Sequence, residues 1–228
     1  MASVLDNPIW NALCSVDSDK NIGSHDLAFL DADVAPFIGM QNWDGNSQKK
    51  LLSNTPSNRS WFLLIADEVN FIDELEIAFT IPLYQFVCNK LKNFIAPKID
   101  IAITELNPSH VDEMLALTAL TKPGPFMKRT IEFGNYHGIF DGNRLAAMGG
   151  ERLHLDGFTE ISAICTHPDF RGHGYGAAIT HHLAKSVIQK GQTPFLHARI
   201  DNISAIEIYK KLGFEIRATI QFYIIRRK

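Results

Sequence analysis

The stretch "CTHPDFRGHGYGAA", residues 165–178, places three glycines at alternate positions behind an arginine, and the sequence after it is typical of an amphipathic helix. Glycine is unfavourable at the start of a helix unless the backbone must do something that a Cβ atom would prevent. The first turn of a helix carries free N–H groups and a partial positive charge. The stretch alone therefore allows two interpretations: a turn for close strand–helix packing, or a cradle for phosphate.

Other glycine-rich phosphate motifs fit these residues less well. A P-loop ends in Lys followed by Ser or Thr, whereas this chain has Ala177 and Ala178 there. A dinucleotide fingerprint needs G-x-G-x-x-G, and the spacing here is G-x-G-x-G. Arg171, just before the first glycine, adds a charge-assisted donor for an anion.

The composition is that of a soluble globular protein, with 46% hydrophobic and 21% charged residues among 228. A net charge of −3 argues against a nucleic-acid binder that uses a broad basic surface. Cys14, Cys88 and Cys165 lie far apart without CxxC spacing, which predicts no metal site and reduced thiols in the cytoplasm. Residues 1–14 do not resemble a signal peptide, and no apolar run is long enough to span a membrane.

The sequence predicts two regions, a smaller and irregular α/β region at 1–97 and a regular α/β domain with a mixed sheet at 98–228. In the first region we expect strands at 61–67 and 75–87, and then a linker that contains Pro97. In the second we expect strands at 98–106, 158–167 and 194–200, and one or two strands at 214–227. We also expect helices at 107–121, 175–190 and 202–213, a short helix near Arg129, and a hairpin at 136–155.

Two motifs in the second region carry a family resemblance. "HPDFRGHGYGAAITHHL" (167–183) resembles the R/Q-x-x-G-x-G/A signature of the GNAT superfamily of acetyl-CoA-dependent N-acetyltransferases. "DNISAIEIYKKLGF" (201–214) is similar to the superfamily segment N-x-x-A-x-x-x-Y-x-x-x-GF. The resemblance covers roughly residues 98–228 and favours the phosphate cradle over the packing turn. It implies the GNAT fold with a splayed central sheet, acetyl-CoA as co-substrate, and a primary amine of a small molecule or peptide as acceptor.

The resemblance also implies which residues hold the cofactor. Asn202 matches a family asparagine that contacts it, although the same residue suits an N-cap of the following helix. The backbone of Ile164, Cys165 and Thr166 matches the strand segment that holds the pantetheine arm. The pyrophosphate would take the N–H groups of Arg171, Gly172, His173, Gly174, Tyr175 and Gly176.

Tyr209 matches the family tyrosine that protonates the departing thiolate of coenzyme A. A phenol suits this role because its pKa of about 10 keeps it protonated. The alternative is a core aromatic residue. Cys165 is interpreted as a buried thiol rather than a nucleophile, because the sequence supplies it with no basic partner.

Glu160 matches the catalytic glutamate of the histone acetyltransferase branch, six residues before Thr166. On an unbulged strand the two side chains would share a face about 20 Å apart, at about 3.3 Å per residue. A bulge would exchange the faces. Glu151 is the second candidate base, and Arg152 and Phe126 are candidate substrate contacts.

The resemblance leaves the role of residues 1–97 open. An extra region before a GNAT domain resembles the two-domain layout of glycine N-acyltransferase-like enzymes, in which it would be a degenerate GNAT-like half over the acceptor site. A non-catalytic acyl-CoA-binding or regulatory module is the alternative function, and Glu160 and Tyr209 favour the enzyme. We expect no nucleic-acid, membrane or metal partner, and a homodimer stays open.

Overall fold

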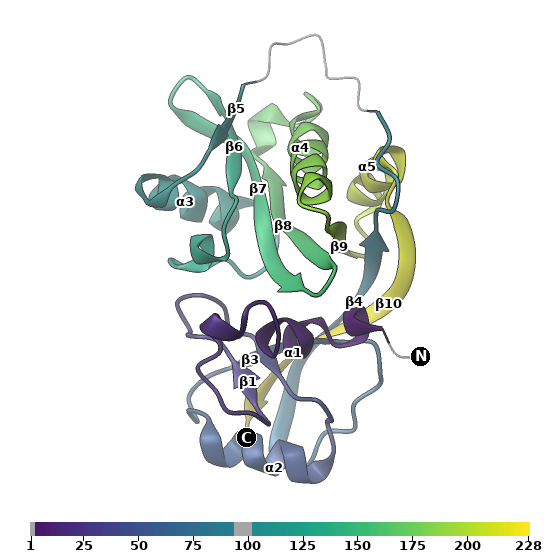
Figure 1. Ribbon diagram of the computed structural model, residues 1–228. Helices are drawn as coiled ribbons and strands as arrows, with labels where there is room; N and C mark the ends of the chain where they lie inside the picture. The colour runs from purple at the N-terminus through teal and green to yellow at the C-terminus, as the bar shows by residue number, and fades with distance from the viewer. Residues whose placement is uncertain (1–2, 94–101) are drawn as a thin grey trace.

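The computed structural model describes residues 3–93 and 102–228. Its centre is a mixed sheet of eight strands in the order β3-β10-β4-β9-β8-β7-β6-β5, with helices on both faces (Figure 1). The mixed α/β architecture predicted from the sequence is confirmed. The predicted boundary at residue 97 and the start of the strand expected at 98–106 lie outside the described residues.

Half of the sheet is an antiparallel meander. It consists of β5 (Ile103–Glu105), β6 (His137–Asp141), β7 (Arg144–Leu155) and β8 (Phe158–Thr166). Gly142 takes φ +57° in the β6–β7 turn, a conformation that favours glycine and matches the predicted hairpin. The helix α3 (Val111–Thr121) and the short 3-10 helices η3 (Pro108–His110) and η4 (Thr130–Phe133) connect β5 to β6.

A crossover helix then leads to the rest of the sheet. The next elements are η5 (Pro168–Phe170), α4 (Tyr175–Gln189), β9 (Thr193–Arg199), α5 (Ile203–Leu212) and β10 (Glu215–Arg227). β9 runs parallel to β8, as a strand–helix–strand crossover requires. Ile179 and Leu183 of α4 and Leu212 of α5 pack with Leu196 of β9 in one buried cluster. α4 and α5 therefore cover one face of the sheet.

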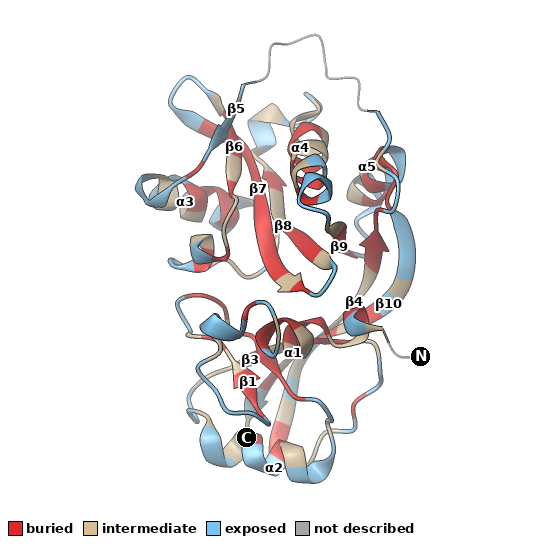
Figure 2. Cartoon of the chain, viewed as in Figure 1, coloured by how far each residue is buried: buried red, intermediate tan, exposed pale blue. Residues whose placement is uncertain are grey.

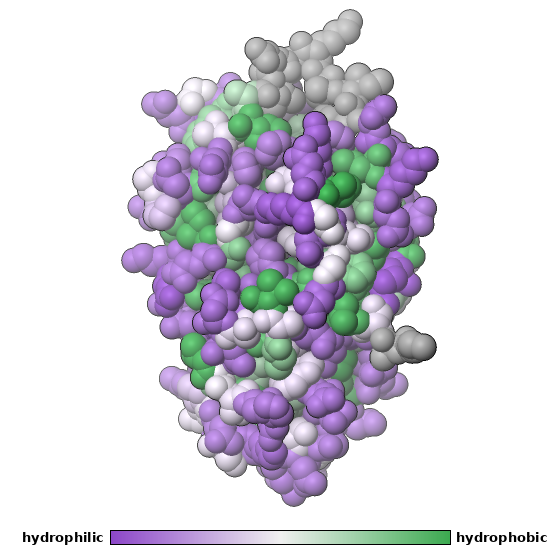
Figure 3. All heavy atoms as spheres, viewed as in Figure 1, coloured by the Kyte–Doolittle hydropathy of each residue, from purple (hydrophilic) through white to green (hydrophobic). Residues whose placement is uncertain are grey.

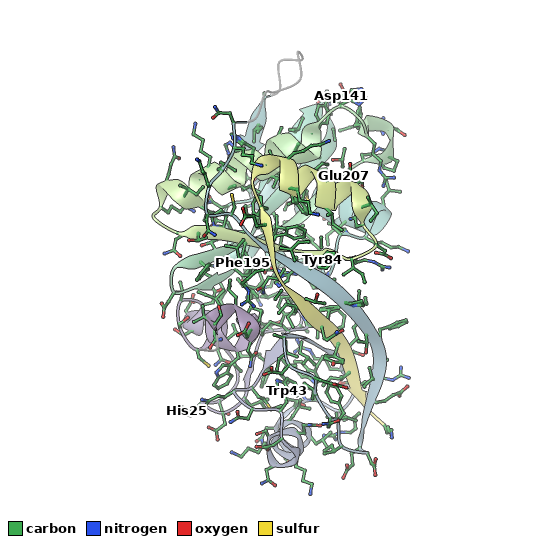
Figure 4. All side chains as sticks on the ribbon, turned by 90° about the vertical axis from the view of Figure 1, so that its right-hand side faces the viewer. His25, Trp43, Tyr84, Asp141, Phe195 and Glu207 are labelled. Atoms are coloured by element: carbon green, nitrogen blue, oxygen red, sulfur yellow. The ribbon has the colours of Figure 1, made fainter. Side chains whose placement is uncertain are left out.

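The first 93 residues contribute strands to the same sheet. β4 (Leu75–Val87) lies between β9 and β10 and runs antiparallel to both, and β3 (Trp61–Ile65) pairs with the other side of β10. Figure 4 shows β4 and β10 side by side along much of the molecule. The remaining elements there are η1 (Val4–Asp6), α1 (Pro8–Leu13), η2 (Ser18–Lys20), β1 (Ala28–Phe29), β2 (Ile38–Gly39) and α2 (Gly45–Asn54).

α1 covers the other face of the sheet. Its Ile9 and Leu13 share a cluster with Phe37 and with Phe195 of β9. Phe195 precedes Leu196, which packs with α4, and successive side chains of a strand point to opposite faces. The central strands are accordingly buried while α2 is largely exposed (Figure 2).

The visible surface is mainly hydrophilic, with scattered apolar patches (Figure 3). Within the described part of the chain, no helix is long and apolar enough to span a membrane.

Candidate functional site

β8 and β9 separate partway along their length. In the described structure they pair only where Phe158–Glu160 face Thr193–Phe195. Beyond that point β8 stays paired with β7, and β9 stays paired with β4. The backbone N–H and C=O groups of residues 161–166 that face β9 therefore have no strand partner. They are available to another partner, because strand backbone groups need hydrogen bonds. The predicted pantetheine segment, 164–166, lies in this splay.

A bulge interrupts β8 inside the splay. Met148 pairs with Cys165 but Gly150 pairs with Ser162, so β8 has one more residue than β7 in this interval. Ala163 lies in the interval with φ +54°, in the left-handed region. Of the two alternatives left open by the sequence, the bulged strand is the one observed, so Glu160 and Thr166 do not share a face, because an additional residue reverses the alternation of side chains.

The glycine stretch forms an open turn at the N-terminus of α4. Gly172 and Gly174 have φ +83° and +78°, and a Cβ on Gly172 would meet nothing within 4 Å. Gly172 is thus required by its backbone conformation and not by close packing. In the described structure the N–H groups from 172 to 177 donate to no backbone carbonyl, and Ala178 is the first to do so, to Gly174 O at 3.0 Å. These donors and the exposed Arg171 side chain fit a phosphate-bearing group.

α5 carries the second signature beside the splay. The Asn202 side chain accepts a hydrogen bond from Ala205 N at 3.3 Å and so caps the helix. Tyr209 is 7% exposed and packs against Phe86 and Phe214, with ring centroids 5.7 and 6.1 Å away. Both side chains therefore have structural roles, which are compatible with additional contacts to a ligand.

Burial keeps the Tyr209 hydroxyl and the Cys165 thiol protonated. It raises the pKa of Tyr209, and the nearby Cys165 thiolate would raise it further. Burial also raises the pKa of Cys165 to about 11. Cys165 is therefore a neutral thiol near neutral pH, as the interpretation as a buried thiol requires.

Glu160 is fully buried and bound on both oxygens. Arg152 donates from Nε to Oε2 at 2.8 Å and from Nη2 to Oε1 at 2.6 Å, and His197 Nδ1 lies 2.7 Å from Oε1. Burial would raise the pKa of Glu160, but the Arg152 charge and these hydrogen bonds outweigh it and hold the pKa well below its usual range. The Arg152 guanidinium in turn lies 5.0 Å over the ring of buried Phe37. Glu160 is thus an enclosed anion.

His197 is a site residue that the sequence analysis missed. It lies on β9 two residues beyond the last pair with β8, and its Nε2 is 3.0 Å from Gln85 Nε2. Arg217 donates to Gln85 Oε1, which identifies the other amide atom as the NH2 group that donates to Leu5 O and to His197. Gln85 of β4 is paired with His197 of β9 in the sheet, and this strand register cannot be predicted from the sequence.

Glu151 belongs to a different network. It accepts hydrogen bonds from Asn135 Nδ2 at 2.7 Å and Lys190 Nζ at 2.9 Å, and His154 Nε2 lies 3.3 Å away. Lys190 follows the last residue of α4, so Glu151 is bound at the end of this helix opposite the glycine turn, and the two helix ends are about 22 Å apart at about 1.5 Å per residue. The structure does not bring Glu151 together with Glu160, although the two strands are neighbours.

His154 connects this network to the N-terminal region, because its Nδ1 lies 3.0 Å from Asp17 Oδ1. Burial would lower the pKa of His154, but Asp17 and Glu151 outweigh it and raise the pKa to about 9. A raised pKa in the folded state stabilises the protein below the unfolded value, about 6.5, and this stabilisation is lost as the pH rises through 9.

We therefore expect the His154→Asn variant to be less stable than wild type at pH 6, with the difference shrinking toward pH 9.5. Urea unfolding of both proteins from pH 6 to 9.5 measures it. A stability difference that does not change with pH would contradict the ionic role of His154.

Of the predicted substrate residues, Arg152 is held by Glu160, and half-buried Phe126 packs edge-on to Tyr136, with ring centroids 5.6 Å apart. Arg129 N donates to Asp33 O at 2.7 Å, so the segment after α3 is attached to the N-terminal region.

Comparison with known proteins agrees with this geometry. Residues 136–223 match the family model "FR47-like protein". An acetyltransferase of Yersinia enterocolitica is 30% identical over 135 residues, which cover 58% of this chain and 77% of that protein. A solved structure from Novosphingobium aromaticivorans, described as of the GNAT family, superposes over 100% of both chains with a TM-score of 0.90 and 29% identity. The chain belongs to the GNAT superfamily of acetyltransferases.

Other relatives match over a shorter stretch. A mycothiol acetyltransferase of Mycolicibacterium smegmatis is 32% identical over 69 residues, 28% of this chain. The chain spans only 23% of that protein's length, and 30% of the corresponding protein of Mycolicibacterium vanbaalenii. The acceptor of those enzymes is therefore not carried over to this chain.

Proposed function

We propose that this chain transfers the acetyl group of acetyl-CoA to a primary amine of a small molecule or peptide in the cytoplasm. The observation that carries the proposal is the separation of β8 from β9 next to the open N-terminal turn of α4. The first supplies free strand backbone, and the second supplies free helix N–H groups. When bound there, acetyl-CoA would supply an acetyl group activated as a thioester.

Bound acetyl-CoA would extend from the N-terminal turn of α4 into the splay between β8 and β9. The N–H groups of residues 172–176 would bind the pyrophosphate, with the Arg171 side chain adding its charge, because the Arg171 N–H already donates to Pro168 O at 3.3 Å. The backbone of residues 164–166 would hydrogen-bond the pantetheine arm, which places its far end toward the bulge at Ala163. Asn202 would add a contact while still capping α5.

Two proton movements accompany the transfer. Tyr209 is the proposed acid, because burial keeps its hydroxyl protonated and therefore able to donate a proton to the thiolate as it departs. Glu160 is the proposed base that accepts the proton of the amine, and it would act through His197. The carboxylate holds Nδ1–H, which leaves Nε2 as the basic nitrogen. The Gln85 amide, which now donates to Nε2, would give way to the amine.

The region 1–97 is proposed to form part of the acceptor side, and 98–228 the transferase domain. Support comes from contacts between the segment after α3 and the N-terminal loop: Thr130 Oγ1 donates to Val34 O at 2.6 Å, and Arg129 pairs with Asp31. Both lie on the sheet face opposite α4, toward which Glu160 points.

Release of free thiol from acetyl-CoA in the presence of a panel of primary amines, including peptides with free N-termini, tests the function. We expect turnover with at least one amine. Binding of acetyl-CoA without turnover on any amine would favour the non-catalytic acyl-CoA-binding module instead.

The cradle itself is tested by Gly172→Ala, with Gly191→Ala as control. Both glycines have positive φ, +83° and +75°, and open space around the missing Cβ, so both variants carry a similar backbone strain of about 1–2 kcal/mol. Only Gly172 lies where the pyrophosphate would bind. We expect at least a tenfold loss of coenzyme A affinity by calorimetry for Gly172→Ala and none for Gly191→Ala; equal affinities would place the pyrophosphate elsewhere.

A further inference from the structure

The hydroxyl of Tyr136 is buried and has no hydrogen-bond partner among the described residues. Tyr136 is only 1% exposed. A buried hydroxyl that lacks a partner costs about 1–3 kcal/mol, and a phenylalanine would fill the same space without that cost. The presence of a tyrosine at this position is explained if a bound ligand forms the hydrogen bond that the protein itself does not supply.

The ring of Tyr136 extends across β7 toward the bulge of β8. A Cβ atom on Gly150 would lie 2.4 Å from Cδ1 of the ring, so the ring lies directly against the Gly150 backbone. Gly150 pairs with Ser162, which immediately precedes Ala163 in the bulged interval. Tyr136 and Cys165 belong to one buried cluster, and Ala163 packs against it.

The groups around the hydroxyl belong to the proposed site. Its titratable neighbours are Arg152, Glu160 and Cys165. Arg152 and Glu160 form the buried ion pair, and Cys165 lies on the splayed part of β8. Phe126 packs edge-on to the ring, with ring centroids 5.6 Å apart. Burial raises the pKa of Tyr136, so the hydroxyl stays neutral and can donate a hydrogen bond.

We propose that the Tyr136 hydroxyl donates a hydrogen bond to the acetyl carbonyl oxygen of bound acetyl-CoA, at the bulge of β8. This inference rests on the proposed function, because the pantetheine arm along residues 164–166 must bring its end to Ala163. A neutral donor suits a carbonyl oxygen, on which negative charge grows while the amine attacks. The hydroxyl reaches this point from the face opposite α4.

Tyr136→Phe tests the proposal, with Tyr223→Phe as control. Tyr223 is a buried tyrosine, 6% exposed, on β10 in a separate cluster of the N-terminal region. Three quantities are measured on the full chain: the thermal midpoint, the affinities for acetyl-CoA and for coenzyme A by calorimetry, and turnover. Coenzyme A lacks the acetyl group, so the ratio of the two affinities isolates contacts to that group.

For Tyr136→Phe we expect an unchanged or higher thermal midpoint, because a buried unpaired hydroxyl is removed. We expect acetyl-CoA affinity to fall about three- to tenfold while coenzyme A affinity stays constant, and turnover to fall about a hundredfold. Tyr223→Phe should leave the affinity ratio and turnover unchanged.

Three results would overturn the inference. A thermal midpoint lowered by several degrees would show that the hydroxyl has a structural partner. Unchanged affinity ratio with unchanged turnover would show that it touches no substrate. An unchanged ratio with reduced turnover would assign it to the acceptor amine instead. Failure of the proposed function would look different, because wild type itself would then either bind neither coenzyme A nor acetyl-CoA, or bind acetyl-CoA without turnover on any amine.

Discussion

Glu160→Gln is expected to destabilise the protein by about 3–5 kcal/mol, because it leaves the Arg152 guanidinium buried without its counter-ion. The Arg152 side chain is 11% exposed and that of Glu160 is 0% exposed, so water cannot replace the lost carboxylate. Glutamine keeps the shape of the side chain but not its charge. Urea unfolding at pH 7 measures the loss.

The matched control is Glu132→Gln. Glu132 also forms a bidentate pair with an arginine, Arg129, but both side chains are 46% exposed. Exposed pairs contribute about 0–1 kcal/mol, so this variant should remain close to wild type. Equal small losses for Glu160→Gln and Glu132→Gln would contradict the account of Glu160 as an enclosed anion.

The Glu160–Arg152 pair also makes the free energy of unfolding depend on pH. The pKa of Glu160 is lowered in the folded protein, so its contribution is present above the unfolded value of about 4.3 and is lost as the pH falls below it. The stability gap between wild type and Glu160→Gln should therefore narrow from pH 5 toward pH 3. Turnover per folded molecule, measured on the same variant, reports separately on the proposed role through His197.

Tyr209→Phe is expected to lower turnover by about 10²- to 10⁴-fold, the contribution typical of a general acid, while coenzyme A affinity stays within about twofold. The substitution removes one oxygen and keeps the ring that packs on Phe86 and Phe214. Folding should therefore be preserved, which circular dichroism and the thermal midpoint verify.

Tyr223→Phe again serves as the control for loss of a phenol away from the splay. If Tyr209→Phe turned over acetyl-CoA as fast as wild type, Tyr209 would be a packing residue and the thiolate would take its proton from elsewhere. A parallel loss of coenzyme A binding would instead assign the hydroxyl to cofactor recognition.

Local features of the fold were predictable from local sequence. Glycines after a strand and before an apolar helical stripe predicted a turn at the start of α4, and the N-cap that was one of the two interpretations of Asn202 is present in α5. These features depend on residues within a few positions of one another, where hydrogen-bonding and backbone preferences decide the conformation.

Non-local pairings were not predictable. The strand at 75–87 was expected, but its position between β9 and β10 depends on partners more than 100 residues away. β10 was expected as one or two strands and is a single strand that pairs with both β3 and β4. Periodicity indicates that a segment is a strand and does not identify its neighbours.

The bulges explain why the surroundings of Glu160 were missed. One irregularity between β7 and β8 lies near Ala163 and another between Glu151 and His154. Together they bring Arg152 onto Glu160 and reverse the face of Thr166 relative to it. Ala163 adopts φ +54° without being glycine or asparagine, so no residue type in the strand indicated the bulge.

We propose that coenzyme A binds between β8 and β9 with its pyrophosphate on the N-terminal turn of α4. A crystal structure of the full chain with coenzyme A tests it most directly. We predict pyrophosphate oxygens within hydrogen-bond distance of N–H groups of residues 172–176, and pantetheine amides paired with the backbone of residues 164–166. Coenzyme A bound outside the splay, or a splay closed by direct β8–β9 pairing, would contradict the account.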